Sequence, residues 1–101
     1  MEVIINNEAH GCEAKLIGRL DTAASPEVSD ALQPLMDKAG GTLVLDCHEM
    51  TYIASSGLRI FLNLRKAAAL KGGKVIVRGI NSDIRNVFMM TGFLNLFQIE
   101  D

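Results

Sequence analysis

The feature that most constrains the fold is the alternation of short apolar runs with longer segments of helical spacing. Apolar runs of strand length occur at residues 3–5, 14–17, 42–46, 74–78 and 94–99. Helical patterns follow the second, third and fourth runs and begin near residues 25, 55 and 82. Such alternation implies right-handed crossovers between parallel strands. We therefore predict an α/β fold, a mixed and mostly parallel central sheet with helices packed against it, whose first strand is an edge partner of different polarity.

The first helix has a clear start signal in Ser25-Pro26-Glu27, which places a serine at the cap, a proline in the first turn and an acid near the helix dipole. One apolar stripe follows, and Gly40-Gly41 stops the helix. The residues of that stripe are Val28, Leu32, Leu35 and Met36. The pattern predicts a single helix between these two signals.

The later helices are marked in the same way. The second begins at Ser55 or Ser56, runs to about Leu70 and ends at Gly72-Gly73, and the third is capped by 81–83 and stops before Gly92. Three polar residues mark the solvent side of the second helix, namely Arg59, Asn63 and Lys66. The third helix carries its apolar residues at Ile84, Val87 and Phe88, and Met89 and Met90 are predicted to belong to the core and its rim.

Two stretches predict how the strands are arranged. The polar stretch 6–11 between the first two apolar runs is typical of a hairpin-like turn. The continuous apolar run 42–46 is typical of a strand that is covered on both faces, as in a parallel sheet.

The size and charge of the chain exclude several classes of protein. With 101 residues, 49% of them hydrophobic, the chain is expected to form one domain over residues 1–101 with a single core. A net charge of −2 gives no basic surface for nucleic acid. No apolar run reaches the roughly 18 residues that a membrane helix needs, and the first residues lack the basic region and small-residue cleavage site that are typical of a signal peptide. We expect a cytoplasmic protein without membrane insertion.

The sequence contains no recognisable catalytic, cofactor or metal motif. Cys12 and Cys47 lie in apolar segments and are expected to be reduced, buried thiols. His10 and His48 have no flanking ligand cluster, so we assign no metal site. Neither a nucleophile elbow nor a phosphate-binding glycine loop is present. We therefore predict that the chain is not an enzyme and holds no cofactor.

The stretch from Tyr52 to Leu58 is the strongest candidate for a functional site. Ser55 and Ser56 fall where a loop is expected to become a helix, at which point serine is favoured as a cap. The helix N-terminus also carries a partial positive charge that favours an anion such as phosphate. Two interpretations of Ser55 therefore stand side by side, a structural cap and a site of phosphorylation.

Four motifs in this chain resemble those of the STAS domain. They are Gly18-Arg19-Leu20-Asp21, Leu43-Val44-Leu45-Asp46, Ile53-Ala54-Ser55-Ser56-Gly57-Leu58 and Gly72-Gly73-Lys74-Val75. The segment 87–93 also fits, so the resemblance covers nearly the whole chain. More narrowly, the chain is similar to the stand-alone bacterial anti-sigma-factor antagonists.

This resemblance implies a switch controlled by phosphorylation. In the family, the dephosphorylated antagonist binds an anti-sigma factor that is also a serine kinase, and so frees a sigma factor. The kinase phosphorylates the first serine of the pair, which is Ser55 here, and a metal-dependent serine phosphatase resets the switch. The expected partner-binding residues are Asp21, Ala54, Ser56, Gly57 and Leu58.

Two features leave alternatives open. The family usually has aspartate directly before the phosphoacceptor, where this chain has Ala54, so a second hypothesis is a non-phosphorylated STAS subunit of a membrane lipid or solute transport complex that docks on its ATPase. Asp21 matches a loop aspartate on the partner surface of the family, and it is equally typical of a turn residue whose carboxylate accepts backbone N–H groups.

Overall fold

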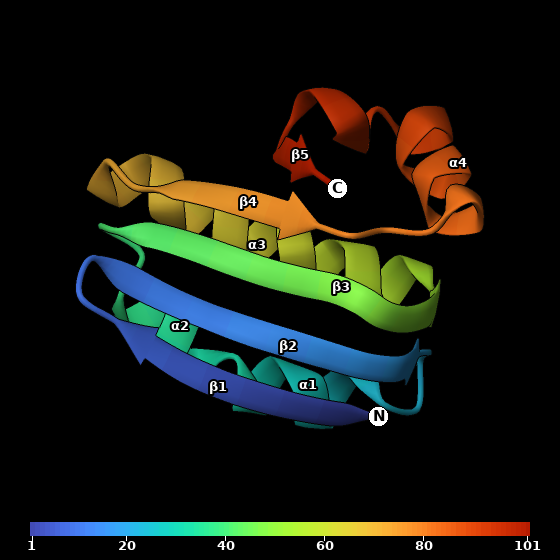
Figure 1. Cartoon of the computed structure of the whole chain (residues 1–101), viewed down its shortest axis with the longest axis horizontal. Helices are drawn as coiled ribbons and strands as arrows, with labels where there is room; N and C mark the ends of the chain where they lie inside the picture. Colours follow the sequence, from blue (N-terminus) through green and yellow to red (C-terminus); the bar gives the residue numbers. More distant parts are fainter.

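The computed structural model describes residues 1–101 as a five-stranded sheet with helices against it (Figure 1). The strands lie in the order β1-β2-β3-β4-β5, with β1 antiparallel to β2 and all other neighbours parallel. Their bounds are β1 Glu2–Glu8, β2 Gly11–Leu20, β3 Thr42–Ile53, β4 Lys74–Arg78 and β5 Gln98–Glu100. The mixed, mostly parallel sheet with an antiparallel edge strand is thus confirmed.

The helices pack on one face of the sheet, and Figure 1 shows α1, α2 and α3 behind the strands. Their bounds are α1 Ser25–Ala31, α2 Gln33–Asp37, α3 Ser55–Lys71 and α4 Ser82–Thr91, with a short 3₁₀ helix, η1, at Phe93–Asn95. The predicted starts at residues 25, 55 and 82 are confirmed. No helix combines the length and apolar character that crossing a membrane would need.

The core lies between the sheet and these helices. It is one cluster of 22 buried residues, to which every strand from β2 to β4 and all four helices contribute. Phe61 of α3 meets Phe88 of α4 edge to face, with ring centroids 6.2 Å apart, and Phe97 packs against both. The aromatic contacts therefore fix α3 and α4 to the same core.

The other face of the sheet has no helix on it, so the prediction that 42–46 is covered on both faces is wrong. Leu43 and Leu45 belong to the core, whereas the side chain of Val44 lies on the open face beside Ile76 of β4. Val44 and Ile76 are nevertheless only 5% and 6% exposed. A continuous apolar run can therefore arise in a strand whose second face is shielded by neighbouring side chains rather than by a helix.

The first three strands are longer than the apolar runs predicted. Asn6 pairs with Glu13, and Glu8 with Gly11, so the expected turn over 6–11 shrinks to two residues. β3 continues past Asp46 to Ile53 because it stays paired with β2 as far as Leu20. Consequently only one residue, Ala54, separates the end of β3 from α3, where a loop had been predicted.

Two helices, α1 and α2, take the place of the single helix predicted between Ser25 and Gly40, and Ser25 is not the cap of α1. Pro34 has no N–H and its ring clashes with the preceding turn, so α1 ends and α2 begins around Leu32. The N-cap of α1 is Ala24, and Ser25 lies inside the fold at 8% exposure. A proline at the start of α1 remains as predicted.

The C-terminal part follows its caps more closely. The Asn81 side chain accepts a hydrogen bond from the Ile84 amide at 2.8 Å, which confirms the predicted cap of α4. The predicted strand at 94–99 is only β5, because η1 occupies the start of that segment. The core prediction for two methionines is wrong, since Met89 and Met90 are 60% and 82% exposed on the outer side of α4.

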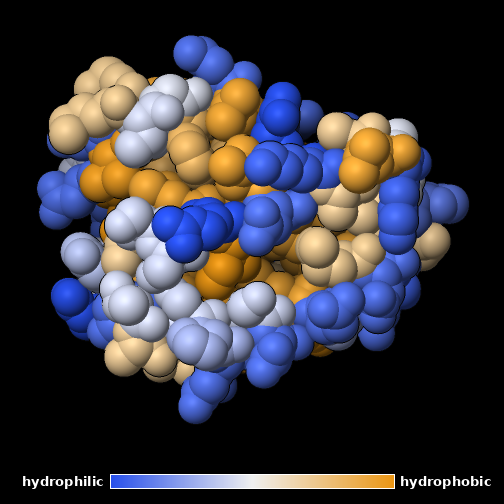
Figure 2. Space-filling model, turned by 180° about the vertical axis from the view of Figure 1, so that it is seen from behind, coloured by the Kyte–Doolittle hydropathy of each residue, from blue (hydrophilic) through white to orange (hydrophobic).

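Figure 2 shows the molecule from the side opposite to that of Figure 1. Apolar atoms reach the surface at its upper left, at the end of the molecule that carries α4. The exposed large apolar side chains of α4 are the two methionines. Their position follows from the helical period, which turns them away from the buried Ile84 and Phe88.

Candidate functional site at the start of α3

The candidate site lies where β2 and β3 leave the sheet together. Leu20 is the register partner of Ile53, so Asp21 and Ala54 are the next residues of two adjacent parallel strands. The Ala54 amide donates to the Leu20 carbonyl at 2.9 Å and continues the ladder by one bond. The register therefore brings Asp21 next to the start of α3.

Ala54 is the N-cap of α3, and this corrects the prediction of a serine cap. Its backbone is extended, with φ −92° and ψ 170°, and no side chain caps the helix. The Leu58 amide donates to the Ala54 carbonyl at 3.0 Å, which closes the first turn. The amides at the start of a helix have no intrahelical partner. The start of α3 thus offers N–H groups and the positive end of the helix dipole to an anion.

The two adjacent serines have different surroundings. Ser55 is exposed, and no other group accepts from or donates to its hydroxyl. Ser56 is half-buried, and its Oγ lies 2.7 Å from the Oγ of Ser25. Of the pair, Ser55 is the more exposed residue and the one whose hydroxyl has no hydrogen-bond partner in the protein. This distinction was not visible in the sequence.

Asp21 is held by the loop that it begins. Its carboxylate accepts the Ala24 amide at 2.9 Å, which is the turn role that had been one of two interpretations. Its backbone carbonyl accepts both the Ser25 amide at 3.1 Å and the Ser25 hydroxyl at 2.8 Å. Three hydrogen bonds therefore hold the loop from Asp21 to Ser25, and the Ser25 hydroxyl connects this loop to Ser56.

Gly57 and Leu58 lie inside the protein beneath the exposed serine. Leu58 is 7% exposed, and a Cβ added at Gly57 would come within 2.6 Å of the Leu20 side chain and 2.9 Å of the Ile53 side chain. A larger residue at Gly57 would therefore push α3 away from the ends of β2 and β3. These two residues set the position of Ser55, while the accessible surface consists of Asp21, Ala54, Ser55 and Ser56.

Sequence reasoning missed the contacts that three neighbours of this site make. Ser25 was interpreted only as a cap, although its hydroxyl connects Asp21 to Ser56. Arg19 and Tyr52 are register partners on β2 and β3, and the guanidinium of Arg19 lies 4.3 Å from the centre of the Tyr52 ring. The motif Gly-Arg-Leu-Asp contains Arg19, but only the strand register reveals its aromatic partner.

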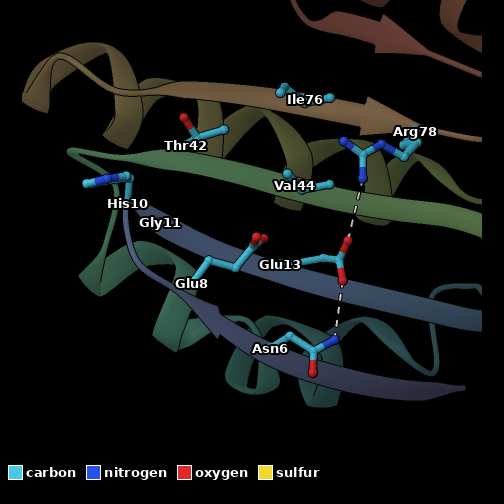
Figure 3. A pocket seen from close by; sticks show the side chains of 9 residues that line it. All are labelled: Asn6, Glu8, His10, Gly11, Glu13, Thr42, Val44, Ile76 and Arg78. Atoms are coloured by element: carbon cyan, nitrogen blue, oxygen red, sulfur yellow. Dashed lines mark hydrogen bonds and ion pairs between the residues drawn. The ribbon is translucent and has the colours of Figure 1, made fainter.

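A hollow of about 560 Å³ lies on the open face of the sheet (Figure 3). Two of its charged side chains have partners: Glu13 accepts from Asn6 at 3.2 Å, and Arg78 pairs with Glu100 at 3.0 Å and with Glu13 at 3.7 Å. The hollow includes Thr42, which begins β3, whereas Ser55 follows the end of β3. The hollow and the serine pair are therefore separate features.

The two cysteines and Asp46 of the sheet have displaced pKa values. Burial raises the pKa of the Cys47 thiol, and Cys12 is raised by burial as well, so both are the buried thiols that were predicted. Partial burial raises the pKa of Asp46, but hydrogen bonds from the amide and ring of His48, with attraction by His48 and Lys15, lower it overall. No three His, Cys, Asp or Glu side chains are placed to share a metal ion.

The fold agrees with the comparisons to known proteins. Residues 4–101 match the STAS domain, and the chain belongs to that family. Within it, the relatives are anti-sigma factor antagonists. The name of BtrV of Bordetella bronchiseptica gives this role as a provisional assignment. BtrV is 30% identical over 85% of this chain and 74% of its own length. The anti-sigma-B factor antagonist of Listeria monocytogenes is 26% identical over 83% of this chain and 74% of its own.

Solved structures show the same fold at lower identity. The unphosphorylated form of the anti-sigma factor antagonist SpoIIAA covers 99% of this chain and 88% of its own, with a TM-score of 0.76 and 16% identity. An anti-sigma factor antagonist from Mycobacterium paratuberculosis covers 98% and 84%, with a TM-score of 0.85 and 17% identity. SpoIIAA of Bacillus has also been solved in its phosphorylated form, with a TM-score of 0.74 and 16% identity over 97% of this chain and 90% of its own. None of these relatives favours the transport-subunit hypothesis.

Proposed function

We propose that this chain is an anti-sigma factor antagonist switched by phosphorylation of Ser55. In the unmodified state it binds an anti-sigma factor that is also a serine kinase and so frees a sigma factor. Phosphorylation separates the two proteins, and a serine phosphatase restores the active antagonist. The chain acts by binding, without catalysis of its own.

The observation that carries this proposal is the exposure of one serine hydroxyl at a helix start. Ser55 is accessible and unbonded, while Ser56 is engaged with Ser25. A phosphate on Ser55 would meet free amides and the helix dipole of α3, so the fold should accept it with little change. The names of the sequence relatives and the two solved states of SpoIIAA support the same function.

The partner interface should tolerate the phosphate far less well than the fold. A phosphate adds about −1.5 to −2 charges at neutral pH. Burying an unmatched charge against a partner costs roughly 3 kcal/mol, and each 1.4 kcal/mol is tenfold in affinity. Modification of Ser55 should therefore weaken binding about a hundredfold. Asp21, Ala54 and Ser56 form the accessible surface around it and are proposed to contact the partner.

Ala54 bears on this mechanism because the family usually has aspartate there. Compared with aspartate, alanine lacks the carboxylate that would repel the phosphate, and it also lacks one contact that a kinase could use. The site therefore remains chemically able to accept phosphate.

The test is to incubate the chain with the anti-sigma factor kinase of the same organism and ATP, then to map the modified residue by mass spectrometry. We expect one phosphate, on Ser55, and a Ser55→Ala variant that resists phosphorylation. A matched Ser56→Ala variant should remain a substrate. Phosphate on Ser56 alone would refute the assignment, and its absence from every residue would refute the switch.

A further inference from the structure

Ser25 is the only polar residue among the buried residues of the chain, and its hydroxyl faces Ser56. It lies at the start of α1, 31 residues before Ser56, yet the two Oγ atoms are 2.7 Å apart. Nothing about the cap of α1 requires this contact, since Ala24 is the N-cap and makes no side-chain bond. The burial of Ser25 therefore calls for a reason other than capping.

The protons of this hydroxyl pair can be assigned from its neighbours. A serine hydroxyl has one proton to donate and two lone pairs to accept with. The Ser25 hydroxyl lies 2.8 Å from the Asp21 carbonyl, which can only accept, so the Ser25 proton is used there. Both hydrogen bonds are satisfied only if Ser56 donates to Ser25. The chain of donors thus runs from Ser56 to Ser25 to the Asp21 carbonyl.

We propose that Ser25 is a specificity-determining residue that directs phosphorylation to Ser55 by holding the hydroxyl of Ser56. This inference rests on the proposed function and adds the reason why one of two adjacent serines is the acceptor. In the transfer, a serine Oγ forms a bond to the γ-phosphorus of ATP, the bond to the bridging oxygen of ADP breaks, and the hydroxyl proton passes to a base of the kinase. At Ser56 that proton points into the protein, towards Ser25.

The size of the preference follows from the bond that Ser56 would have to break. To reach the kinase, the Ser56 hydroxyl must rotate away from Ser25 and leave a buried oxygen with one partner fewer. The net contribution of a neutral hydrogen bond is equivalent to about tenfold in an equilibrium. Removing the Ser25 hydroxyl should therefore raise the reactivity of Ser56 by about tenfold. Ser55 has no such bond and should be unaffected.

The experiment compares the rate of Ser56 phosphorylation in a Ser55→Ala background, with the anti-sigma factor kinase of the same organism and ATP. Adding Ser25→Ala should raise that rate about tenfold, whereas Ser25→Thr, which keeps a hydroxyl, should leave it unchanged. In the presence of Ser55, Ser25→Ala should give phosphate on both serines, mapped by mass spectrometry. A general loss of stability would not shift the ratio between two adjacent residues.

Two results would overturn the inference, and they are distinct from failure of the proposed function. One is phosphate on Ser55 of the wild type together with an unchanged Ser56 rate when Ser25→Ala is added. The other needs no variant: the Ser56 hydroxyl proton, observed by NMR in the wild-type chain, should exchange with water more slowly than that of Ser55, and equal exchange would show that it is not held. Absence of phosphate from the wild type would instead remove the proposed function, and this inference with it.

Discussion

Replacing Ala54 by aspartate should stabilise the protein, because α3 begins without a side-chain cap. The backbone of Ala54 already has the extended conformation that N-cap residues adopt, with φ −92° and ψ 170°. An aspartate there can accept a hydrogen bond from the amide of Ser56 or Gly57, the second and third residues of the helix. The difference between alanine and a good cap is about 1 kcal/mol, within a range of roughly 0.5–2 kcal/mol.

This contribution is large enough to measure. For a domain of roughly this size, about 1 kcal/mol raises Tm by roughly 4–8 °C. The assay is thermal unfolding followed by circular dichroism, together with urea denaturation, for the wild type, Ala54→Asp, Ala54→Asn and Ala54→Val. Aspartate and asparagine should both stabilise, and valine should not. Aspartate should exceed asparagine by about 0.3–1 kcal/mol, because its charge also interacts with the helix dipole.

The pH dependence of stability distinguishes the hydrogen bond of the cap from the effect of the aspartate charge. A carboxylate that accepts N–H groups has a lowered pKa in the folded state, so its extra stability is present above the unfolded pKa of about 3.9. That extra stability is lost as the pH falls through the lower folded pKa, while the asparagine variant keeps its gain. Equal Tm values for wild type, Ala54→Asp and Ala54→Asn would show that the first amides of α3 are already satisfied, and would remove the predicted partners of the phosphate.

Three further changes test how the sheet and the site are held. Gly57→Ala should destabilise by about 1–3 kcal/mol in urea denaturation, because its Cβ meets the Leu20 side chain at 2.6 Å; an unchanged midpoint would contradict that close approach. Asp46→Asn should cost more stability at pH 7 than at pH 3. The lowered pKa of Asp46 stabilises the fold above the unfolded pKa, and this gain declines as the pH falls towards the folded pKa. A constant difference between the two pH values would argue against it. Cys47, which is buried and has a raised pKa, should react with a maleimide only after denaturation, and rapid labelling of the native protein would show that its strand opens.

The order of the elements could be predicted because each depends on residues close together in the sequence. The apolar runs of β4 and the core of β3, the Asn81 cap and the glycine at the end of α3 all act within one turn or strand. The antiparallel first strand also followed from a short hairpin. Local chemistry was therefore sufficient for the α/β class and for the starts of the helices.

The length of β3 and the orientation of the site depended on distant residues. Beyond Asp46 the strand becomes polar, and the register between β2 and β3 shifts after Lys15, so simple alternation disappears while pairing continues. The bond between Ser25 and Ser56 joins residues 31 apart, and no local pattern announces it. The residue type of Met89 does not show that it lies outside the core, because its exposure depends on which face of α4 is turned towards the core.

The central claim is tested most directly by the affinity of the chain for the anti-sigma factor of the same organism, measured by calorimetry before and after phosphorylation of Ser55. We expect the unmodified chain and Ser55→Ala to bind alike, and the phosphorylated chain to bind about a hundredfold more weakly. Its Tm should change little, since the phosphate meets free amides at the start of α3. Equal affinity of the modified and unmodified chains, or binding by the phosphorylated form alone, would contradict a switch in which Ser55 phosphorylation releases the partner.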